Sequence, residues 1–270
     1  MKVFVVLVLA LATASAAVLP KVTPVHPKDR KASASSIQGR VTNGREAVEG
    51  EVPYQVGLSF ATESGSGWWC GGSLISSEWI LTAAHCTSGA SSVSAILGAT
   101  ARIAPLVTVV AKSSEFSTHA SYNSILLRND IALIKIQAVT FSSRINAIAL
   151  ASSDAGTLEG ETGKISGWGL TSDQATTVAD KLMTADVTII ANSVCASTYG
   201  TMVVTDRNVC IDTSNAVSTC SGDSGGPLVV KNVLAGVTSF GASAGCELGY
   251  PAGFTRVTYY LDWINAITNL

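Results

Sequence analysis

The chain has 270 residues and carries 17 Lys and Arg against 19 Asp and Glu, a formal net charge of −2. Residues 1–40 hold six of the basic residues and one of the acidic ones, so the other 230 residues carry 11 basic and 18 acidic side chains, a net charge of −7. This acidic balance excludes the basic patch of a nucleic-acid-binding protein and the basic amphipathic helix that binds anionic membranes.

The first 17 residues have the pattern of a secretory signal. Lys2 precedes the apolar run 3–11, and small residues follow as far as Ala17. A charged start, about ten apolar residues and an A-x-A-like end are typical of a signal that is removed. A membrane anchor is the alternative, but it needs roughly 20 apolar residues. We therefore expect a secreted, extracellular and soluble protein.

Residues 18–40 are polar, contain three prolines and five basic residues, and end at Arg40. Such a composition buries little apolar surface, so we expect this segment to be mobile. Val41 begins sequence that is apolar enough to fold. Two interpretations fit the segment: an activation propeptide cut after Arg40, or an N-terminal tail that stays attached. The first divides the chain into a signal at 1–17, a propeptide at 18–40 and a folded domain at 41–270.

Short apolar or alternating runs, about ten residues apart, dominate the chain after Val41. They are rich in Val, Ile, Thr and aromatic residues, as in antiparallel sandwiches and barrels. The clearest runs are 54–60, 71–75, 79–83, 92–97, 106–111, 131–136, 163–168, 186–190, 227–230 and 233–240. Apolar residues at helical spacing occur only from Val257 to Thr268 and predict a short amphipathic helix. The pattern predicts an all-β chain without a linker between domains.

All six cysteines follow Val41, which fits an oxidising compartment and three disulfides. Six cysteines allow 15 pairings, and the sequence alone does not choose among them. No CxxC pair occurs, and His85 is the only histidine close to a cysteine in the sequence. We therefore expect no metal site and no cofactor.

The segment Cys220–Pro227 reads Cys-Ser-Gly-Asp-Ser-Gly-Gly-Pro, with four of its eight residues Gly or Pro. The backbone must turn sharply there. Glycines around Ser224 would leave its hydroxyl exposed and backbone N–H groups free to bind a substrate oxygen. A plain loop is the usual meaning of such a segment. A catalytic role therefore requires a base and an orienting acid elsewhere in the chain.

Two further residues could supply these groups. His85 stands at the end of an apolar, strand-like run, where a lone histidine beside a cysteine is usually structural. Asp130 precedes the apolar run from Ile131, and a carboxylate that enters a core needs a partner or hydrogen bonds. An exposed start of a strand is the alternative for Asp130. Each of these signals is weak by itself.

Taken together and in this order, three motifs resemble the trypsin/chymotrypsin family of serine endopeptidases. They are Ala83-Ala84-His85-Cys86, Asn129-Asp130-Ile131-Ala132-Leu133 and Gly222-Asp223-Ser224-Gly225-Gly226-Pro227. The resemblance runs from Arg40 to the final helix, and the sequence from Cys246 onward is most similar to arthropod digestive chymotrypsin-like enzymes, including the crustacean collagenase type. It implies an all-β fold of two six-stranded antiparallel Greek-key barrels packed together, with a short C-terminal helix.

The resemblance also assigns catalytic roles. Ser224 would be the nucleophile and His85 the base that takes its proton. Asp130 would hold the imidazole in the right tautomer and stabilise its protonated form. The N–H groups of Gly222 and Ser224 would form the oxyanion hole that binds the developing negative charge.

Activation is implied by Asp223. A carboxylate next to the nucleophile in a tight, buried turn needs a counter-charge. In the family that charge is a new α-amino group. An activating trypsin-like protease would cut between Arg40 and Val41, and the Val41 ammonium would pair with Asp223 and order the oxyanion hole. The preceding segment has no cysteine, so it would detach.

The substrate cleft is implied at five positions. Ser239, Phe240 and Gly241 resemble the strand that pairs with the substrate backbone, with Phe240 in place of the more usual tryptophan. Ser218 would lie at the floor of the specificity pocket, Ala252 on its back wall, and Gly241 would leave the entrance open. Because Ser218 carries no charge, a substrate Arg or Lys would stay unpaired. The pocket is expected to accept Phe, Tyr, Leu or Met before the cut bond.

The resemblance selects one disulfide pairing, which is Cys70–Cys86, Cys195–Cys210 and Cys220–Cys246. It implies a monomer that digests dietary protein in the lumen of a gut, with proteins and peptides as substrates. An elastase-like or collagenolytic protease is the nearest alternative. A regulatory protease usually carries further cysteine-rich modules, and a non-catalytic secreted homologue usually lacks the serine or the histidine. This chain has no such modules and keeps both residues.

Overall fold

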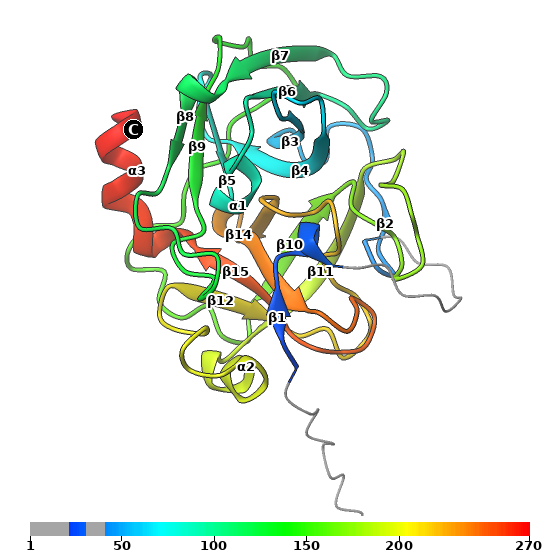
Figure 1. The fold of residues 1–270 in the computed structure, drawn as a ribbon, viewed down its shortest axis with the longest axis vertical. Coiled ribbons are helices and arrows are strands. Elements are labelled where there is room, and N and C mark those ends of the chain that lie inside the picture. Colours follow the sequence, from blue (N-terminus) through cyan, green and yellow to red (C-terminus); the bar gives the residue numbers. More distant parts are fainter. Residues whose placement is uncertain (1–21, 31–40) are drawn as a thin grey trace, which may run out of the picture.

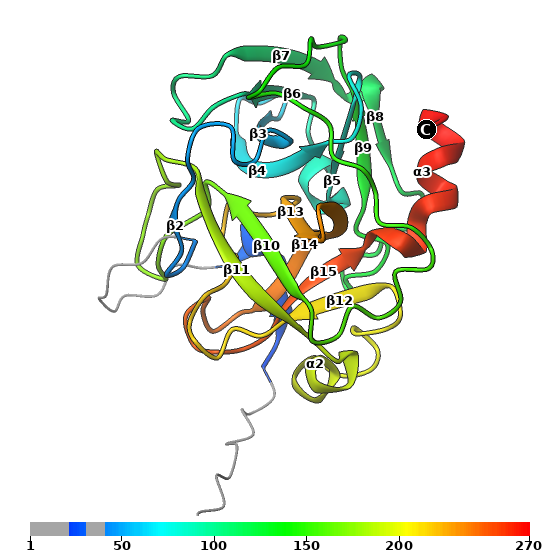
Figure 2. The same cartoon turned by 180° about the vertical axis from the view of Figure 1, so that it is seen from behind.

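The computed structural model describes residues 22–30 and 41–270. The predicted signal at 1–17 and the expected cleavage residue Arg40 lie outside these ranges. The described residues form two antiparallel sheets, one above the other, with few helices (Figure 1). Figure 2 shows the same arrangement from behind, with β10 and β11 in front. The predicted all-β class and the pair of packed antiparallel sheets are confirmed.

The first sheet has seven strands in the order β7-β6-β3-β4-β5-β9-β8. Their bounds are β3 (Gln55–Ala61), β4 (Gly67–Leu74), β5 (Trp79–Thr82), β6 (Ser92–Leu97), β7 (Val107–Lys112), β8 (Phe116–Thr118) and β9 (Ala132–Lys135). The end of β5 pairs with the start of β9, with Thr82 opposite Ala132. Because His85 follows β5 closely and Asp130 precedes β9 closely, this pairing brings the two residues to the same edge of the sheet.

Six strands of the second sheet form a closed barrel. They are β10 (Thr162–Gly167), β11 (Met183–Ile190), β12 (Asn208–Ile211), β13 (Pro227–Val230), β14 (Val233–Ala242) and β15 (Ala252–Arg256). β15 pairs with both β12 and β14, and these pairings close the ring. Two short strands lie outside it, β1 (Pro24–Val25) on β14 and β2 (Arg45–Glu46) on β11. The expected six strands are therefore found in this barrel, whereas the first sheet has seven.

Each sheet surrounds its own apolar core. Leu58, Ile80 and Leu133 are fully buried in the first, and Ile165 and Phe254 are fully buried in the second. Burial of a side chain of this size contributes roughly 1.5–3 kcal/mol. The core of the first sheet also includes residues of β13 and β14, so the two sheets are packed against each other.

The helices of the described residues are short. α1 (Ala84–Thr87) follows β5, α2 (Asn192–Tyr199) precedes β12, and α3 (Leu261–Thr268) ends the chain; 3₁₀ turns occur at Pro27–Asp29, Ser113–Glu115 and Val257–Tyr260. Although the chain reaches α3 from β15, Ile264 of α3 is buried in the core of the first sheet. The predicted C-terminal helix therefore joins the two halves (Figure 1). Within the described ranges, no helix combines the length and the apolar character that crossing a membrane would need.

Three disulfides connect elements of this scaffold, in the pairing that the resemblance implied. They are Cys70–Cys86 between β4 and α1, Cys195–Cys210 between α2 and β12, and Cys220–Cys246 between the loop before β13 and the loop after β14. The paired cysteines are 15 to 26 residues apart in the sequence. In the chain-entropy account each such bridge stabilises the fold by about 3 kcal/mol.

Residues 22–30 are packed against the domain and are not a loose tail. β1 pairs with the end of β14, and the 3₁₀ turn Pro27–Asp29 follows it. His26 is only 3% exposed. The expectation that residues 18–40 are mobile is therefore wrong for 22–30. Composition indicates only how much apolar surface a segment can bury by itself. Residues 22–30 are instead packed against a surface that another part of the chain provides.

Candidate active site

His85 and Asp130 form a buried, hydrogen-bonded pair. Nδ1 of His85 lies 2.8 Å from Oδ2 of Asp130, and the backbone N–H of His85 donates to Oδ1 at 2.9 Å. Each residue is 1% exposed. Because an ionised carboxylate can only accept, the proton of the neutral imidazole lies on Nδ1 and the lone pair on Nε2. The arrangement therefore leaves Nε2 ready to accept a proton.

Two hydroxyl groups fix Asp130 from the second barrel. Oγ of Ser239 donates to Oδ2 at 2.6 Å, and Oγ1 of Thr255 donates to the Asp130 carbonyl oxygen at 2.7 Å. Burial raises the pKa of Asp130, but the charges of His85 and His26 and the hydrogen bonds from His85 and Ser239 outweigh it and hold the pKa below its ordinary value. Asp130 is thus an ionised carboxylate at neutral pH, and Ser239 lies beside it.

The pKa of His85 is lowered, whereas an ion pair with a carboxylate alone would raise it. Burial, the largest cause, and the charges of His26 and Lys28 together lower it to about 4, against the raising effect of Asp130. The imidazole is therefore neutral at neutral pH, and neutral imidazole is the form that general-base catalysis requires.

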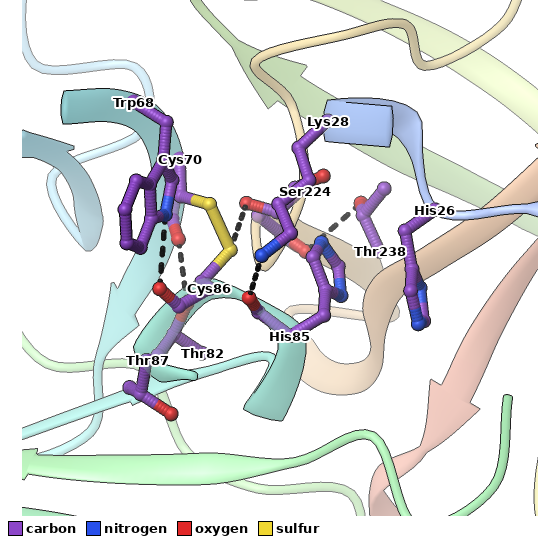
Figure 3. The surroundings of a disulfide bond; sticks show 12 residues. His26, Lys28, Trp68, Cys70, Thr82, His85, Cys86, Thr87, Ser224 and Thr238 are labelled. Atoms are coloured by element: carbon purple, nitrogen blue, oxygen red, sulfur yellow. Dashed lines mark hydrogen bonds between the residues drawn. A yellow bond between two sulfur atoms is a disulfide. The ribbon is translucent and has the colours of Figure 1, made fainter. Parts of the chain in front are cut away.

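Ser224 lies in the tight loop before β13. Gly222 and Gly225 in this loop have φ angles of 99° and 76°, in the left-handed region that favours glycine. A Cβ atom at Gly225 would also collide with Oγ1 of Thr82. The glycines of the motif are thus required by the turn, and the turn holds Ser224 beside His85 (Figure 3).

The structure brings Ser224 and His85 together without a hydrogen bond between them. Neither Oγ of Ser224 nor Nε2 of His85 has a partner among the described residues, although both atoms are shielded from water. Catalytic hydrogen bonds often tighten only when substrate binds. The N–H groups of Gly222 and Ser224 also find no backbone acceptor in residues 22–30 or 41–270. A hydroxyl, a base and two donors are therefore available for attack on a carbonyl group.

Asp223 is a buried carboxylate that forms no ion pair with a cation of residues 22–30 or 41–270. Its oxygens accept the N–H groups of Gly169 at 2.8 Å and Cys220 at 2.9 Å. Burial nevertheless raises the pKa of Asp223 to about 6, because these two hydrogen bonds only partly offset the loss of water. Across the described residues no charged group contributes to this pKa.

Val41, the residue expected to become the new N-terminus, is 1% exposed and belongs to the core of the second barrel. The next residue, Thr42, forms an isolated antiparallel bridge with Ser218. Oγ1 of Thr42 also donates to the Ala216 carbonyl at 2.7 Å. The first residues of the folded domain are therefore buried and lie against the loop of Ser218, the residue predicted to form the floor of the pocket.

The raised pKa of Asp223 predicts how the stability of the uncut chain depends on pH. The pKa of Asp223 is about 6 in the folded chain, against about 3.9 for an aspartate in an unfolded chain. A carboxyl group of this kind stabilises the fold fully at a pH below about 3.9, and this stabilisation is lost as the pH rises through about 6. Asp223→Asn removes the titration, so the variant should become more stable than the wild type as the pH rises from 4 to 8. Between pH 4 and pH 8, the free energy of unfolding of the variant relative to the wild type, measured with urea, should increase by about 3 kcal/mol. Equal pH dependence in both chains would contradict a buried, unpaired Asp223.

The five predicted cleft residues are covered. Ser218, Ser239, Phe240 and Ala252 are at most 3% exposed, and Gly241 is buried as well. The hydroxyl of Ser218 donates to the neighbouring Thr219 carbonyl at 3.1 Å, and no charged side chain of the described residues bonds to it.

Phe240 does not point into open space. Its ring packs edge-on against Tyr199, with 5.5 Å between ring centroids, and lies so close to Gly253 that a Cβ atom there would collide with it. Phe240 thus supports the cleft strand from inside.

Three residues at the site were not predicted from the sequence. His26 stacks on His85 with 4.1 Å between ring centroids, and Nζ of Lys28 donates to the His85 carbonyl oxygen. Arg30 contacts the sulfur of Cys246. Figure 3 shows His26 and Lys28 close to Ser224 and His85. Pro24 and Pro27 were the only signal, because proline favours extended backbone that can lie along a strand edge.

Ligand-type side chains come within reach of one another in three places of the described chain. Two of these clusters contain Cys70–Cys86 or Cys220–Cys246, whose sulfurs are committed to disulfides and are not thiolates. The third joins His26, His85 and Asp130, and their facing atoms already bind one another. None of the three offers a free set of ligands for a metal ion.

Sequences and structures of other proteins are similar to this chain. The profile of the family named Trypsin matches residues 41–264. Brachyurin from Leptuca pugilator is 46% identical over 232 residues, which are 85% of this chain and 99% of the relative. Serine protease 1 from Drosophila melanogaster is 48% identical over 255 residues, 93% of this chain and 91% of the relative. The solved structure of HL collagenase is 40% identical, has a TM-score of 0.79, and the match covers 85% of this chain and 99% of that chain.

Proposed function

Because the chain belongs to the trypsin family of serine endopeptidases, we propose that Ser224, His85 and Asp130 are its catalytic triad and that cleavage after Arg40 activates it. The observation that carries the proposal is the hydrogen bond of 2.8 Å between His85 and Asp130, with the unpartnered hydroxyl of Ser224 beside them. Such a constellation supports acyl transfer through a covalent intermediate.

In the proposed mechanism, Oγ of Ser224 attacks the carbonyl carbon of a peptide bond while Nε2 of His85 takes the hydroxyl proton. Asp130 stabilises the imidazolium, and the N–H groups of Gly222 and Ser224 bind the oxyanion. When the C–N bond breaks, His85 gives its proton to the leaving amine and the acyl group stays on Ser224. Water then attacks the ester with His85 again as the base, and this step releases the acid and the free serine. Loss of one oxyanion donor typically lowers the rate by about 10²–10³.

The proposed activation supplies a positively charged partner for Asp223, which has none among the described residues. Cutting before Val41 creates an ammonium group, which can pair with the buried carboxylate and lower its pKa. The position of Val41 in the second core, beside the loop of Ser218, supports this role. Residues 1–17 would be the secretory signal, residues 18–40 the activation segment and residues 41–270 the protease domain. Three disulfides support passage through an oxidising compartment to the outside of the cell.

We expect cleavage after large apolar residues, in the digestion of dietary protein by a monomer. Ser218 is uncharged, and Glu247, the nearest acid in sequence to the pocket wall, accepts the N–H of Asp173 instead of facing Ser218. A basic side chain would therefore be buried without a partner. The test is a panel of peptide substrates with Phe, Leu, Ala or Arg before the cut bond, given to the cleaved chain. Fastest cleavage after Arg would refute the pocket argument, and fastest cleavage after Ala would favour an elastase-like enzyme.

A substitution at Ser218 tests the same point. Ser218→Asp places an unpaired carboxylate in an apolar pocket, so kcat/KM should fall by about 100-fold or more for a Phe substrate and much less for an Arg substrate. Ser218→Ala is the matched control and should keep the preference for Phe. Equal losses for both substrates would mean that residue 218 does not meet the substrate side chain.

Collagenolytic activity is the second candidate. The similarity to HL collagenase, at 40% identity over 85% of this chain, favours it. It can be tested by comparing triple-helical collagen with heat-denatured collagen as substrates below the melting temperature of the helix. Cleavage of both supports this candidate, whereas cleavage of the denatured form alone supports a general digestive protease.

A further inference from the structure

Residues 22–30 follow the strand that was predicted to bind the substrate backbone. Val25 pairs with Gly241 and Pro24 with Ala242 in an antiparallel register. The N–H of Ser243 also donates to the Thr23 carbonyl at 2.9 Å. This is addition of a strand to the edge of β14, the mode in which extended peptides bind an exposed sheet edge.

His26 then meets the proposed base directly. Its ring lies on the ring of His85 with an interplanar angle of 17°. Its Nδ1 is 2.7 Å from the Ser239 carbonyl oxygen, and its Nε2 is 3.0 Å from the hydroxyl of Tyr122. With both ring nitrogens bonded and 3% of its surface exposed, His26 is an anchor residue of the segment.

After His26 the segment crosses from the second barrel to the first. Oγ of Ser221 donates to the Pro27 carbonyl at 2.5 Å, and Nζ of Lys28 lies 5.1 Å above the ring of Trp68. The Pro27 carbonyl is thus bound by Ser221, and the oxyanion donors are left free. This placement explains how a peptide can lie beside the nucleophile without presenting a carbonyl for attack.

Arg30 closes the entrance of the predicted pocket. Its guanidinium lies against the Cys220–Cys246 disulfide, and a Cβ atom at Gly241 would be 2.9 Å from its Nη2. Burial lowers the pKa of Arg30, with Asp173 opposing this effect. Arg30 has no ion pair with a described residue, and a charged side chain held in a cleft without an ion pair binds weakly. The segment can therefore leave once it is no longer tethered.

We propose that residues 22–30 are an inhibitor built into the chain: they occupy the substrate cleft, and after cleavage at Arg40 the released segment binds the same cleft as a reversible, competitive inhibitor. The proposal rests on the proposed function. Ser224 is 0% exposed and His85 is 1% exposed, although an endopeptidase must admit a peptide to both. No cysteine precedes residue 41, so no disulfide holds the released segment.

The first test uses the uncut full chain and does not depend on activity. Hydrogen exchange, followed by mass spectrometry, should show the amides of residues 22–30 exchanging at least about tenfold more slowly than in a synthetic peptide of the same sequence. His26→Ala should bring the rate toward that of the free peptide. Thr23→Ala, whose side chain is exposed, is the matched control and should leave the protection unchanged. Exchange of the wild-type segment at the free-peptide rate would overturn the proposal.

The second test uses the cleaved chain. A peptide of residues 22–30 should raise KM for a chromogenic substrate and leave kcat unchanged, and the His26→Ala peptide should inhibit about 10- to 100-fold less. The Thr23→Ala peptide should inhibit like the wild type. Full activity in the presence of millimolar peptide, or hydrolysis of the peptide itself, would overturn the proposal. A cleaved chain that hydrolyses nothing would instead refute the proposed function, while the exchange measurement would still decide whether the segment occupies the cleft.

Discussion

Replacement of Ser224 by alanine is expected to lower kcat for peptide hydrolysis by about 10⁶-fold in the cleaved chain. The hydroxyl oxygen is the atom that would become bonded to the acyl group, and the methyl group of an alanine cannot form this ester. The fold should be unaffected, because Oγ of Ser224 makes no hydrogen bond to a described residue. The measurement is the steady-state rate at saturating substrate, with near-ultraviolet circular dichroism to verify the fold.

Three further variants sharpen this result. His85→Ala should lose activity to a similar degree, and the double variant should lose little more, because residues that act as a unit are not additive. Ser193→Ala removes an exposed hydroxyl on α2 and is the matched control, with an expected kcat equal to that of the wild type. A Ser224→Ala chain that keeps more than a small fraction of the wild-type kcat would remove Ser224 from the mechanism.

Replacement of Arg40 by alanine is expected to leave the chain inactive after treatment with trypsin, with kcat/KM at least about 10³-fold below that of treated wild type. Trypsin needs a basic residue before the cut bond, so the Val41 ammonium would not form. Asp223 would then keep its raised pKa and lack a cation. Without this ion pair we expect both oxyanion donors, on Gly222 and Ser224, to be poorly placed.

The control for this experiment is Lys31→Ala, which removes another basic residue of the same segment and should leave activation unchanged. The new N-terminus is identified by mass spectrometry and should be Val41 in every active sample. An Arg40→Ala chain that becomes active with a different N-terminus would contradict the role assigned to the Val41 ammonium.

Much of the fold was predictable because the formation of a strand depends largely on its local sequence pattern. The runs 92–97 and 227–230 are β6 and β13 with the same bounds. β12 and β15 were not recognised as strands, since Asn208–Ile211 and Ala252–Arg256 are short and contain a cysteine or a glycine. Their positions are set by their pairing with each other, by the pairing of β12 with β11 and by that of β15 with β14. These pairings are a property of the closed barrel and not of either segment.

The candidate site was predictable only in part. His85 and Asp130 were identified by their motifs, and the pairing of β5 with β9 explains why they meet. The position of residues 22–30 could not be predicted, because a polar segment gives no sign of the surface it will cover. His26 in particular stands as an isolated histidine in the sequence, and only the fold reveals that it stacks on His85.

We propose that Ser224 becomes an activated nucleophile when the chain is cut before Val41. A fluorophosphonate tests it directly, since it phosphonylates an activated serine with loss of fluoride, and the labelled residue can be mapped by tandem mass spectrometry. We predict a single adduct on Ser224, formed rapidly only after the cut, with hydrolysis lost in proportion to labelling. Hydrolysis that persists when Ser224 is fully labelled, or that is lost through an adduct on another residue, would contradict this claim.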